Sequence, residues 1–200
     1  MKPNSPRSRS VLFPFIAVAA LMLAGCAGPI TRPSEMMSKT GRPAVVASPG
    51  KSLVLFHRPR NHQGWPLYTG VWDSTHFIGD LGNGHSIAYE CNPGTHYFIN
   101  RSVERVGVIE AKLLPNQTYD IRTNIAGAFI ASFQIEPMKA GDRERKRLGD
   151  WEEKHAWMTR ATRADGYESA KQGDIQEVLR DFVSGAKRDR VRHLGADDHR

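Results

Sequence analysis

The segment Ser52-Leu-Val-Leu-Phe-His57 decides the fold class, because it is apolar on both faces over the length of one strand. Such a run is typical of a strand that is covered on both sides of its sheet. From Lys51 to about Ile135 the chain continues as short alternating runs, with turn residues about every 8 to 12 positions. The sequence therefore predicts a mainly β domain over residues 51–138, an antiparallel β-sandwich of about eight strands.

Cys91 ends one of these alternating runs. In the segment 86–91, Ile87, Tyr89 and Cys91 alternate with Ser86, Ala88 and Glu90. We expect Cys91 to be a small buried residue on the inner face of a strand. A nucleophile or a metal ligand is the alternative for this thiol.

Four short motifs follow one another along the same region. They are Arg58-Pro59, Ile78 to Gly84, Pro93 to His96, and Tyr119 after a polar turn. In this order they resemble a family of uncharacterised bacterial lipoproteins with a domain of unknown function, over about residues 51–135. The resemblance implies a sandwich similar to transthyretin-like and carbohydrate-binding modules, and it implies no established activity.

The N-terminus has the pattern of a secretory signal. Residues 1–10 carry three cations and no acid, and residues 11–24 are almost purely apolar. A helix of about 14 residues spans about 21 Å, which is less than the roughly 30 Å of the hydrocarbon layer. Leu23 to Cys26 resembles the lipobox of bacterial lipoproteins, which implies removal of residues 1–25 and acylation of Cys26, with palmitate among the expected chains. An ordinary signal peptide with an incidental cysteine is the alternative.

Further expectations follow from this anchor. By resemblance to Gram-negative lipoproteins, Ala27 favours the outer membrane, with the protein facing the periplasm. Residues 26–50 are rich in Pro, Ser, Gly, Thr and Ala, and we expect them to be a tether. With Cys26 acylated, Cys91 has no intrachain disulfide partner.

The charge balance argues against a nucleic-acid partner. The formal charge of the whole chain is +7, and without residues 1–25 it falls to +4, from 25 Lys and Arg against 21 Asp and Glu. Nucleic-acid-binding domains usually concentrate cations and aromatic residues on one face. From Asp142 to Arg200 the two signs are mixed instead. No cofactor motif is found, so we expect none.

The segment after Pro137 has a helical pattern, and we expect a helical extension over residues 139–186. One helix is predicted over residues 151–161, with Asp150 and Glu153 as a capping pair. A second is predicted over residues 175–185, with Asp174 and Glu177 as the same kind of capping pair. Its apolar stripe is Ile175, Val178, Leu179, Phe182 and Val183. Packing on the sandwich is favoured over docking on a partner or lying on lipid. Residues 187–200 are expected to be a charged, solvated tail.

One loop carries the candidate ligand-binding residues. Residues 57–65 contain Arg58, Arg60, His62 and Trp65. Arginine forks suit phosphate or carboxylate groups, and tryptophan stacks on sugar faces. The alternative is a polar loop in which Trp65 folds back on the domain.

Two other groups of residues carry weaker signals for chemistry. Residues 84–88 approach the nucleophile-elbow pattern, but Ser86 opens a strand where that motif needs a following helix. His76, His85 and His96 together with Cys91 do not have the spacing of a known compact zinc motif. We therefore assign no catalytic residue and no metal ligand. The sequence favours a binding or scaffolding protein of the cell envelope, with a glycan or protein partner, and a hydrolase acting on envelope glycan or lipid is the alternative.

Overall fold

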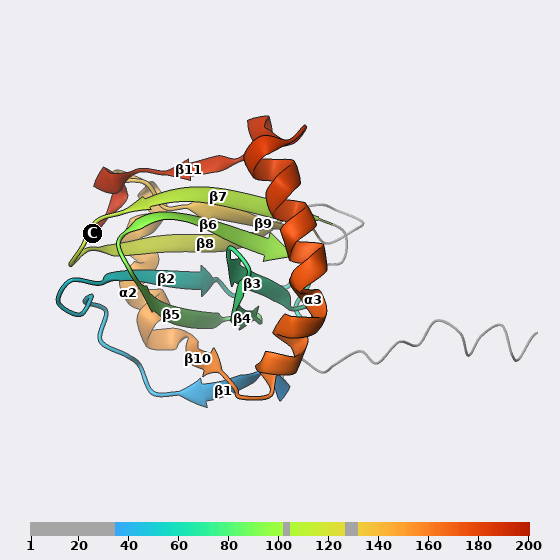
Figure 1. The fold of residues 1–200 in the computed structure, drawn as a ribbon. Helices are drawn as coiled ribbons and strands as arrows, with labels where there is room; N and C mark the ends of the chain where they lie inside the picture. Colours follow the sequence, from blue (N-terminus) through green and yellow to red (C-terminus); the bar gives the residue numbers. More distant parts are fainter. Residues whose placement is uncertain (1–34, 102–104, 127–131) are drawn as a thin grey trace, which may run out of the picture. The chain divides into compact units, whose positions relative to one another are not determined.

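Two β-sheets that share one hydrophobic core form the body of the protein (Figure 1). The computed structural model describes residues 35–101, 105–126 and 132–200. The strands are β1 (Met37–Thr40), β2 (Ser52–Arg58), β3 (Thr69–Asp73), β4 (His76–Leu81), β5 (His85–Cys91), β6 (Gly94–Arg101), β7 (Val106–Leu113), β8 (Thr118–Ala126), β9 (Ser132–Pro137), β10 (Ala156–Arg160) and β11 (Arg192–Leu194). One sheet has the order β1-β10-β5-β2-β8-β9 and the other β11-β7-β6-β3-β4. The predicted mainly β, sandwich-like fold is confirmed.

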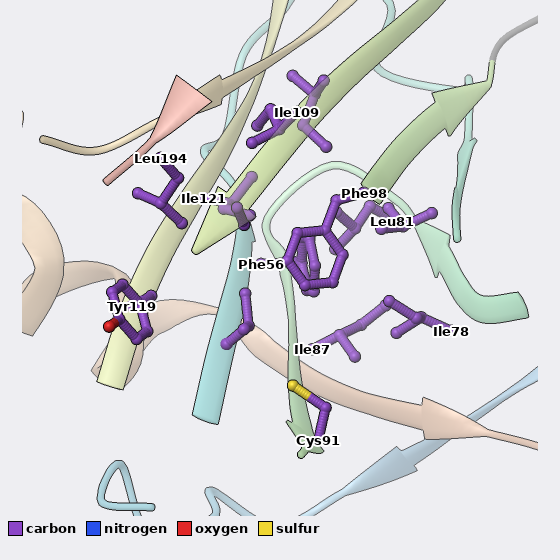
Figure 2. Close-up of a cluster of buried hydrophobic side chains, with 14 of the residues drawn as sticks. Phe56, Ile78, Leu81, Ile87, Cys91, Phe98, Ile109, Tyr119, Ile121 and Leu194 are labelled. Carbon is purple, nitrogen blue, oxygen red and sulfur yellow. The ribbon is translucent and has the colours of Figure 1, made fainter. Parts of the chain in front are cut away.

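Side chains from the inner faces of both sheets fill the space between them (Figure 2). Phe56 of β2 meets Phe98 of β6 edge to face, with the ring centroids 5.3 Å apart. Cys91 lies in this core with 9% of its surface exposed, which confirms its predicted inward orientation. Its thiol lies 3.8 Å from the carbonyl oxygen of Ser52. Burial among apolar side chains is what the alternation along β5 predicts.

Both sheets are mixed, whereas the sequence predicted antiparallel sheets. The pairs β2/β8, β5/β10 and β7/β11 are parallel, and the other neighbours are antiparallel. Each parallel pair joins strands that are far apart along the chain. Short turns can join only antiparallel neighbours, so pattern reading along consecutive segments detects those pairs first.

The folded region begins before the predicted boundary at residue 51. Met36 and Met37 are buried, and β1 pairs with β10 at the edge of the six-stranded sheet. The Met37 sulfur also accepts a hydrogen bond from the backbone N–H of Asp80 at 3.2 Å. The segment that was predicted to be a tether therefore contributes a strand. Cys26 and the predicted signal lie outside the residues that the structure describes.

The helix predicted over residues 151–161 is half right. Helix α2 spans Leu148–Lys154, and after His155 the chain continues as strand β10. Strand β10 lies between β1 and β5, and its Trp157 is buried against Leu53 and Leu55. Tertiary pairing here overrides the helical pattern, because each side of β10 finds an open strand edge.

Helix α3 (Ala164–Leu179) continues into a π-helical turn, Arg180–Ser184, and covers the outer face of the five-stranded sheet. Figure 1 shows α3 running across the strands of this sheet. Ile175 and Phe182 pack against buried Trp72 and Phe77, which confirms that the predicted stripe packs on the sandwich. The predicted start near residue 175 is wrong by more than two turns. Among the residues that the structure describes, no helix is long and apolar enough to cross a membrane.

The last residues are part of the fold, and the predicted solvated tail is wrong. Strand β11 pairs with β7, and Leu194 of β11 is buried in the core between the sheets. Arg200 reaches back to the six-stranded sheet, where its backbone N–H donates to the carbonyl oxygen of Thr118 at 2.9 Å. Alternating charges concealed the apolar pair Val191 and Leu194, both of which are buried.

Candidate functional site

Arg58 is a structural residue, which corrects its assignment to a ligand-binding set. Its side chain is 1% exposed, and its guanidinium donates to the carbonyl oxygens of Gly64, Leu67 and Leu81. The guanidinium carbon lies 4.7 Å from the centre of the Phe133 ring. Burial lowers the pKa of Arg58 to about 10, so it stays protonated at neutral pH. Arg58 thereby fixes the loop 59–68 to the end of the six-stranded sheet.

The other three predicted residues of this loop come together at the surface. Arg60, His62 and Trp65 line a cavity of about 430 Å³ with Asn61 and Asn83. Trp65 is 68% exposed, so it does not fold back on the domain. We call these five residues the Trp65 platform.

Hydrogen bonds within the loop hold the Trp65 platform in place. The backbone N–H of Asn61 donates to the Asn83 side chain at 2.8 Å, and that of Gln63 donates to the Asn61 side chain at 3.0 Å. Leu67 and Tyr68, which end the loop, are 41% and 39% exposed. The platform therefore combines an exposed aromatic face with amide, imidazole and guanidinium groups.

A second cluster, which sequence reasoning missed, is buried on the outer face of the six-stranded sheet, beside α2. Ser86 Oγ lies 2.9 Å from His57 Nδ1 and 2.8 Å from His155 Nδ1. His57 Nε2 in turn lies 3.1 Å from Asp120 Oδ1. The sheet register explains this contact, because Ser86 of β5 pairs with His57 of β2, and β8 lies on the other side of β2. We call Ser86, His57, His155 and Asp120 the Ser86 cluster.

Arg200 neutralises the charge of the Ser86 cluster. Its Nε and Nη2 atoms donate to the two Asp120 carboxylate oxygens at 2.7 and 2.6 Å. Burial acts to raise the pKa of Asp120, but hydrogen bonds from Arg200 and His57 outweigh it and hold the pKa below its usual value. Glu152 lies 2.5 Å from Arg200 Nη1 and 2.8 Å from Arg42 Nη2. Asp120 is therefore an ionised, fully paired carboxylate.

His155 is the neutral end of the Ser86 cluster. Burial is the main cause that lowers its pKa to about 3, and electrostatic interactions with His57, Arg60 and His85 act in the same direction. Because Ser86 is completely buried while His155 lines a cavity of about 390 Å³, the cluster meets the surface at His155. Arg60 lines this cavity and also belongs to the Trp65 platform, so the two features are neighbours.

The Ser86 cluster has the residue types of a Ser-His-Asp triad but not its accessibility. In serine hydrolases, the base that contacts the nucleophile must leave room for a substrate carbonyl and for oxyanion donors. Ser86 Oγ instead lies between two imidazoles and is 0% exposed. In this arrangement the cluster connects three strands and α2, and no acyl group reaches the serine.

The remaining histidines have separate partners. His96 Nδ1 lies 2.7 Å from Asp73 Oδ2, and this hydrogen bond is the main reason that the pKa of His96 rises to about 10. His76 lies 3.3 Å from Glu168, and His85 accepts from the backbone N–H of Gly82 at 3.2 Å. Within the described ranges, no three His, Cys, Asp or Glu side chains converge as metal ligands.

Comparison with known proteins adds no functional information. No family model matches the chain, and no curated protein or solved structure matches it. The Trp65 platform, the Ser86 cluster and the sequence motifs are therefore the features that indicate a function.

Proposed function

We propose that this chain is a lipid-anchored protein of the bacterial cell envelope that binds a saccharide of an envelope glycan on the Trp65 platform. The anchor is the acylated Cys26, in the outer membrane and facing the periplasm. Support for the anchor comes from the basic N-terminus, the short apolar run and the lipobox-like residues Leu23 to Cys26. An acylated N-terminus with more than one chain holds a protein stably on a membrane.

The observation that carries the binding proposal is the exposure of Trp65. A large aromatic ring that is 68% exposed, on a loop held by a buried arginine, is preorganised for stacking on a ligand. Amide and guanidinium groups of Asn61, Asn83 and Arg60 line the same cavity and suit the hydroxyl and carboxylate groups of a sugar. A glycan presents both an apolar ring face and such polar groups.

Tryptophan fluorescence tests this proposal directly. The chain has four tryptophans, and Trp72, Trp151 and Trp157 are at most 4% exposed. A water-soluble quencher therefore reports mainly on Trp65. We expect soluble muropeptides or lipopolysaccharide core oligosaccharides to protect Trp65 from quenching. Trp65→Ala should abolish binding of the same sugar in a calorimetric titration, whereas Val46→Ala, a change at a 72%-exposed residue outside the platform, should preserve it. Equal sugar affinity of the parent and Trp65→Ala would refute the platform.

The anchor has a separate test. The Cys26→Ser variant should appear in the soluble fraction after cell lysis, while the parent sediments with membranes. Co-sedimentation of the Ser variant with membranes to the same extent as the parent would show that another feature holds the protein there.

Hydrolysis of envelope glycan or lipid is the second candidate function, and one observation favours it. Ser86, His57 and Asp120 form a continuous hydrogen-bonded chain. A fluorophosphonate probe, which labels activated serines, distinguishes the two functions. Labelling that disappears in Ser86→Ala would support the hydrolase, whereas the 0% exposure of Ser86 leads us to expect none.

A further inference from the structure

A second cavity adjoins the Trp65 platform. It has a volume of about 390 Å³ and is lined by residues of β1, of the end of α2 and of β10, and it shares Arg60 with the platform. The volumes of both cavities lie in the range of about 300 to 1,000 Å³ that is usual for small-molecule sites. We call this second one the His155 cavity.

The backbone around Arg60 holds this residue between the two cavities. A Cβ atom at Gly84 would lie 2.7 Å from both Cγ and Nε of Arg60, so the arginine side chain lies directly over this glycine. The Arg60 Nη2 atom lies 3.5 Å from the carbonyl oxygen of Lys154, at the end of α2. A ligand that passes over Arg60 would therefore reach from the platform into the His155 cavity.

His155 presents an unpaired nitrogen to this cavity. Its side chain lines the cavity although the residue is only 7% exposed. Its Nδ1 atom is engaged by Ser86 Oγ at 2.8 Å. Its Nε2 atom has no hydrogen-bond partner within residues 35–200 as far as the structure describes them, and the protein does not enclose this atom. Nε2 is therefore the polar atom that a ligand in the cavity would contact.

The hydrogen bonds of the Ser86 cluster make this nitrogen an acceptor. The ionised carboxylate of Asp120 requires a proton on His57 Nε2. Arg200 already balances the charge of Asp120, so we assign His57 as neutral, and its Nδ1 then accepts the Ser86 hydroxyl proton. The Ser86 oxygen in turn accepts from His155 Nδ1, which leaves Nε2 without a proton, because burial lowers the pKa of His155 to about 3 and keeps the ring neutral.

The charges around the His155 cavity are largely paired. Arg42 Nη2 lies 2.8 Å from Glu152 Oε2, and Lys154 Nζ lies 3.2 Å from Asp150 Oδ1. The lining also contains one exposed residue of each sign, Lys39 and Glu153. Such a lining does not select an ion, whereas a hydroxyl-rich ligand finds an acceptor at His155 and both donors and acceptors at the rim.

We propose that the saccharide site extends past Arg60 into the His155 cavity, and that its ligand is an oligosaccharide of at least two sugar residues. This inference rests on the proposed function. One sugar ring stacks on Trp65, and a hydroxyl group of the next residue donates a hydrogen bond to His155 Nε2. A monosaccharide on the platform would leave this acceptor to water.

The test compares sugars of different length on the protein without residues 1–26, which retains the whole compact unit of residues 33–200. Protection of Trp65 from quenching gives the affinities of N-acetylmuramic acid and of the disaccharide N-acetylglucosaminyl-N-acetylmuramic acid. A parallel arm uses a heptose and a diheptose of the lipopolysaccharide core, so the two arms distinguish the two glycans. In the arm that binds, we expect the disaccharide to bind about tenfold more tightly than its monosaccharide, because only the disaccharide reaches His155.

Three variants show whether this preference comes from the His155 cavity. His155→Asn places an amide nitrogen near the position of Nδ1, so it retains a donor for Ser86 and loses the acceptor at Nε2. Thr40→Phe obstructs the cavity from β1. Both variants should lose the preference and bind the disaccharide about as weakly as the monosaccharide. Ser38→Phe, the control at an exposed residue of β1 that does not line the cavity, should keep the tenfold preference.

The outcomes separate this extension from the platform itself. Equal affinities of the parent for the monosaccharide and the disaccharide would overturn the extension and leave the Trp65 platform intact. An unchanged preference in His155→Asn or Thr40→Phe, with circular dichroism like that of the parent, would do the same. Failure of every sugar to protect Trp65 would refute the proposed function and the extension together.

Discussion

The guanidinium of Arg200 donates two hydrogen bonds, of 2.7 and 2.6 Å, to the buried carboxylate of Asp120. Asp120 lies on β8, between β2 and the edge strand β9, and its side chain is 0% exposed, whereas the Arg200 side chain is 25% exposed. Arg200 thus supplies the counter-charge for a carboxylate that is buried in the fold.

Arg200→Ala should therefore destabilise the fold. Removing one partner of a buried ion pair leaves an uncompensated charge and costs about 3–5 kcal/mol, and the partial exposure of Arg200 points to the lower end of that range. Chemical denaturation of the protein without residues 1–26 measures the loss in free energy of unfolding. Arg163→Ala, at an exposed arginine, is the control. A loss below about 1 kcal/mol would place Asp120 in a better-solvated site than its burial indicates.

His155 should make the protein less stable as the pH falls from about 6.5 towards 3. Its pKa in the folded state is about 3, mainly because of burial, so the unfolded chain binds its proton first as the pH falls. The slope from this one group is at most about 1.4 kcal/mol per pH unit. In denaturation curves between pH 6.5 and 3, the free energy of unfolding should depend less on pH in His155→Gln than in the parent. His62→Gln, at an exposed histidine, should leave this pH dependence unchanged.

His96 should act in the opposite direction at alkaline pH. Its hydrogen bond to Asp73 raises its folded pKa to about 10, above the roughly 6.5 of an unfolded histidine. The folded state therefore holds the extra proton, and the stabilisation is complete below about pH 6.5 and lost as the pH rises towards 10. As the pH rises from about 6.5 to 10, the melting temperature should fall less in His96→Gln than in the parent. The same slope in both proteins would argue against a charged His96–Asp73 pair.

Arg58→Lys should disturb the Trp65 platform, although residue 58 does not line its cavity. A lysine cannot reproduce a planar fork that donates to the carbonyl oxygens of Gly64, Leu67 and Leu81. We expect a loss of about 1–3 kcal/mol in stability, since buried acceptors lose their donors, and weaker sugar protection of Trp65. Arg60→Lys, at an exposed residue, should keep the stability of the parent. A stable Arg58→Lys variant with full sugar binding would contradict this role.

Ile175→Ala should cost more stability than Leu179→Ala. Ile175 of α3 is fully buried against the five-stranded sheet, whereas Leu179 is only partly buried at the edge of the same cluster. Large-to-small changes in a core cost about 2–5 kcal/mol, and partial exposure reduces this. Thermal melts of both variants and of Glu177→Ala, at an exposed residue of the helix, provide the comparison. Equal shifts for all three would mean that α3 is not part of the cooperative unit.

The elements that the sequence identified have strong local patterns. Strand β2 contains the unbroken apolar run Leu53 to Phe56, and the C-terminal half of α3 carries an apolar stripe. The N-terminal half of α3 escaped detection because residues 164–174 are mostly polar and include Gly166 and Gly173. Strands β1, β10 and β11 have three to five residues and pair with strands distant in sequence, so no local period distinguishes them.

The Trp65 platform and the Ser86 cluster also differ in how far the sequence predicts them. Four of the five residues of the Trp65 platform lie within residues 60–65, so composition alone indicated three of them. Arg58 was misassigned because an arginine beside a loop gives no sign that it points inward. The Ser86 cluster joins residues 57, 86, 120 and 155. The register of β2 against β5 and β8 brings the first three together, and the pairing of β10 with β5 adds His155. A polar residue within an apolar strand, such as His57, was the available signal.

Because Met37 belongs to the six-stranded sheet, the tether between the fold and the proposed lipid anchor is shorter than the predicted residues 26–50. Nine peptide steps separate Cys26 from Glu35, where the described structure begins, and a fully extended chain covers at most about 3.6 Å per step. If Cys26 carries the proposed anchor, Glu35 lies within about 32 Å of the bilayer surface. The proposed glycan would then be bound close to the membrane, within the length of this tether and of the domain itself.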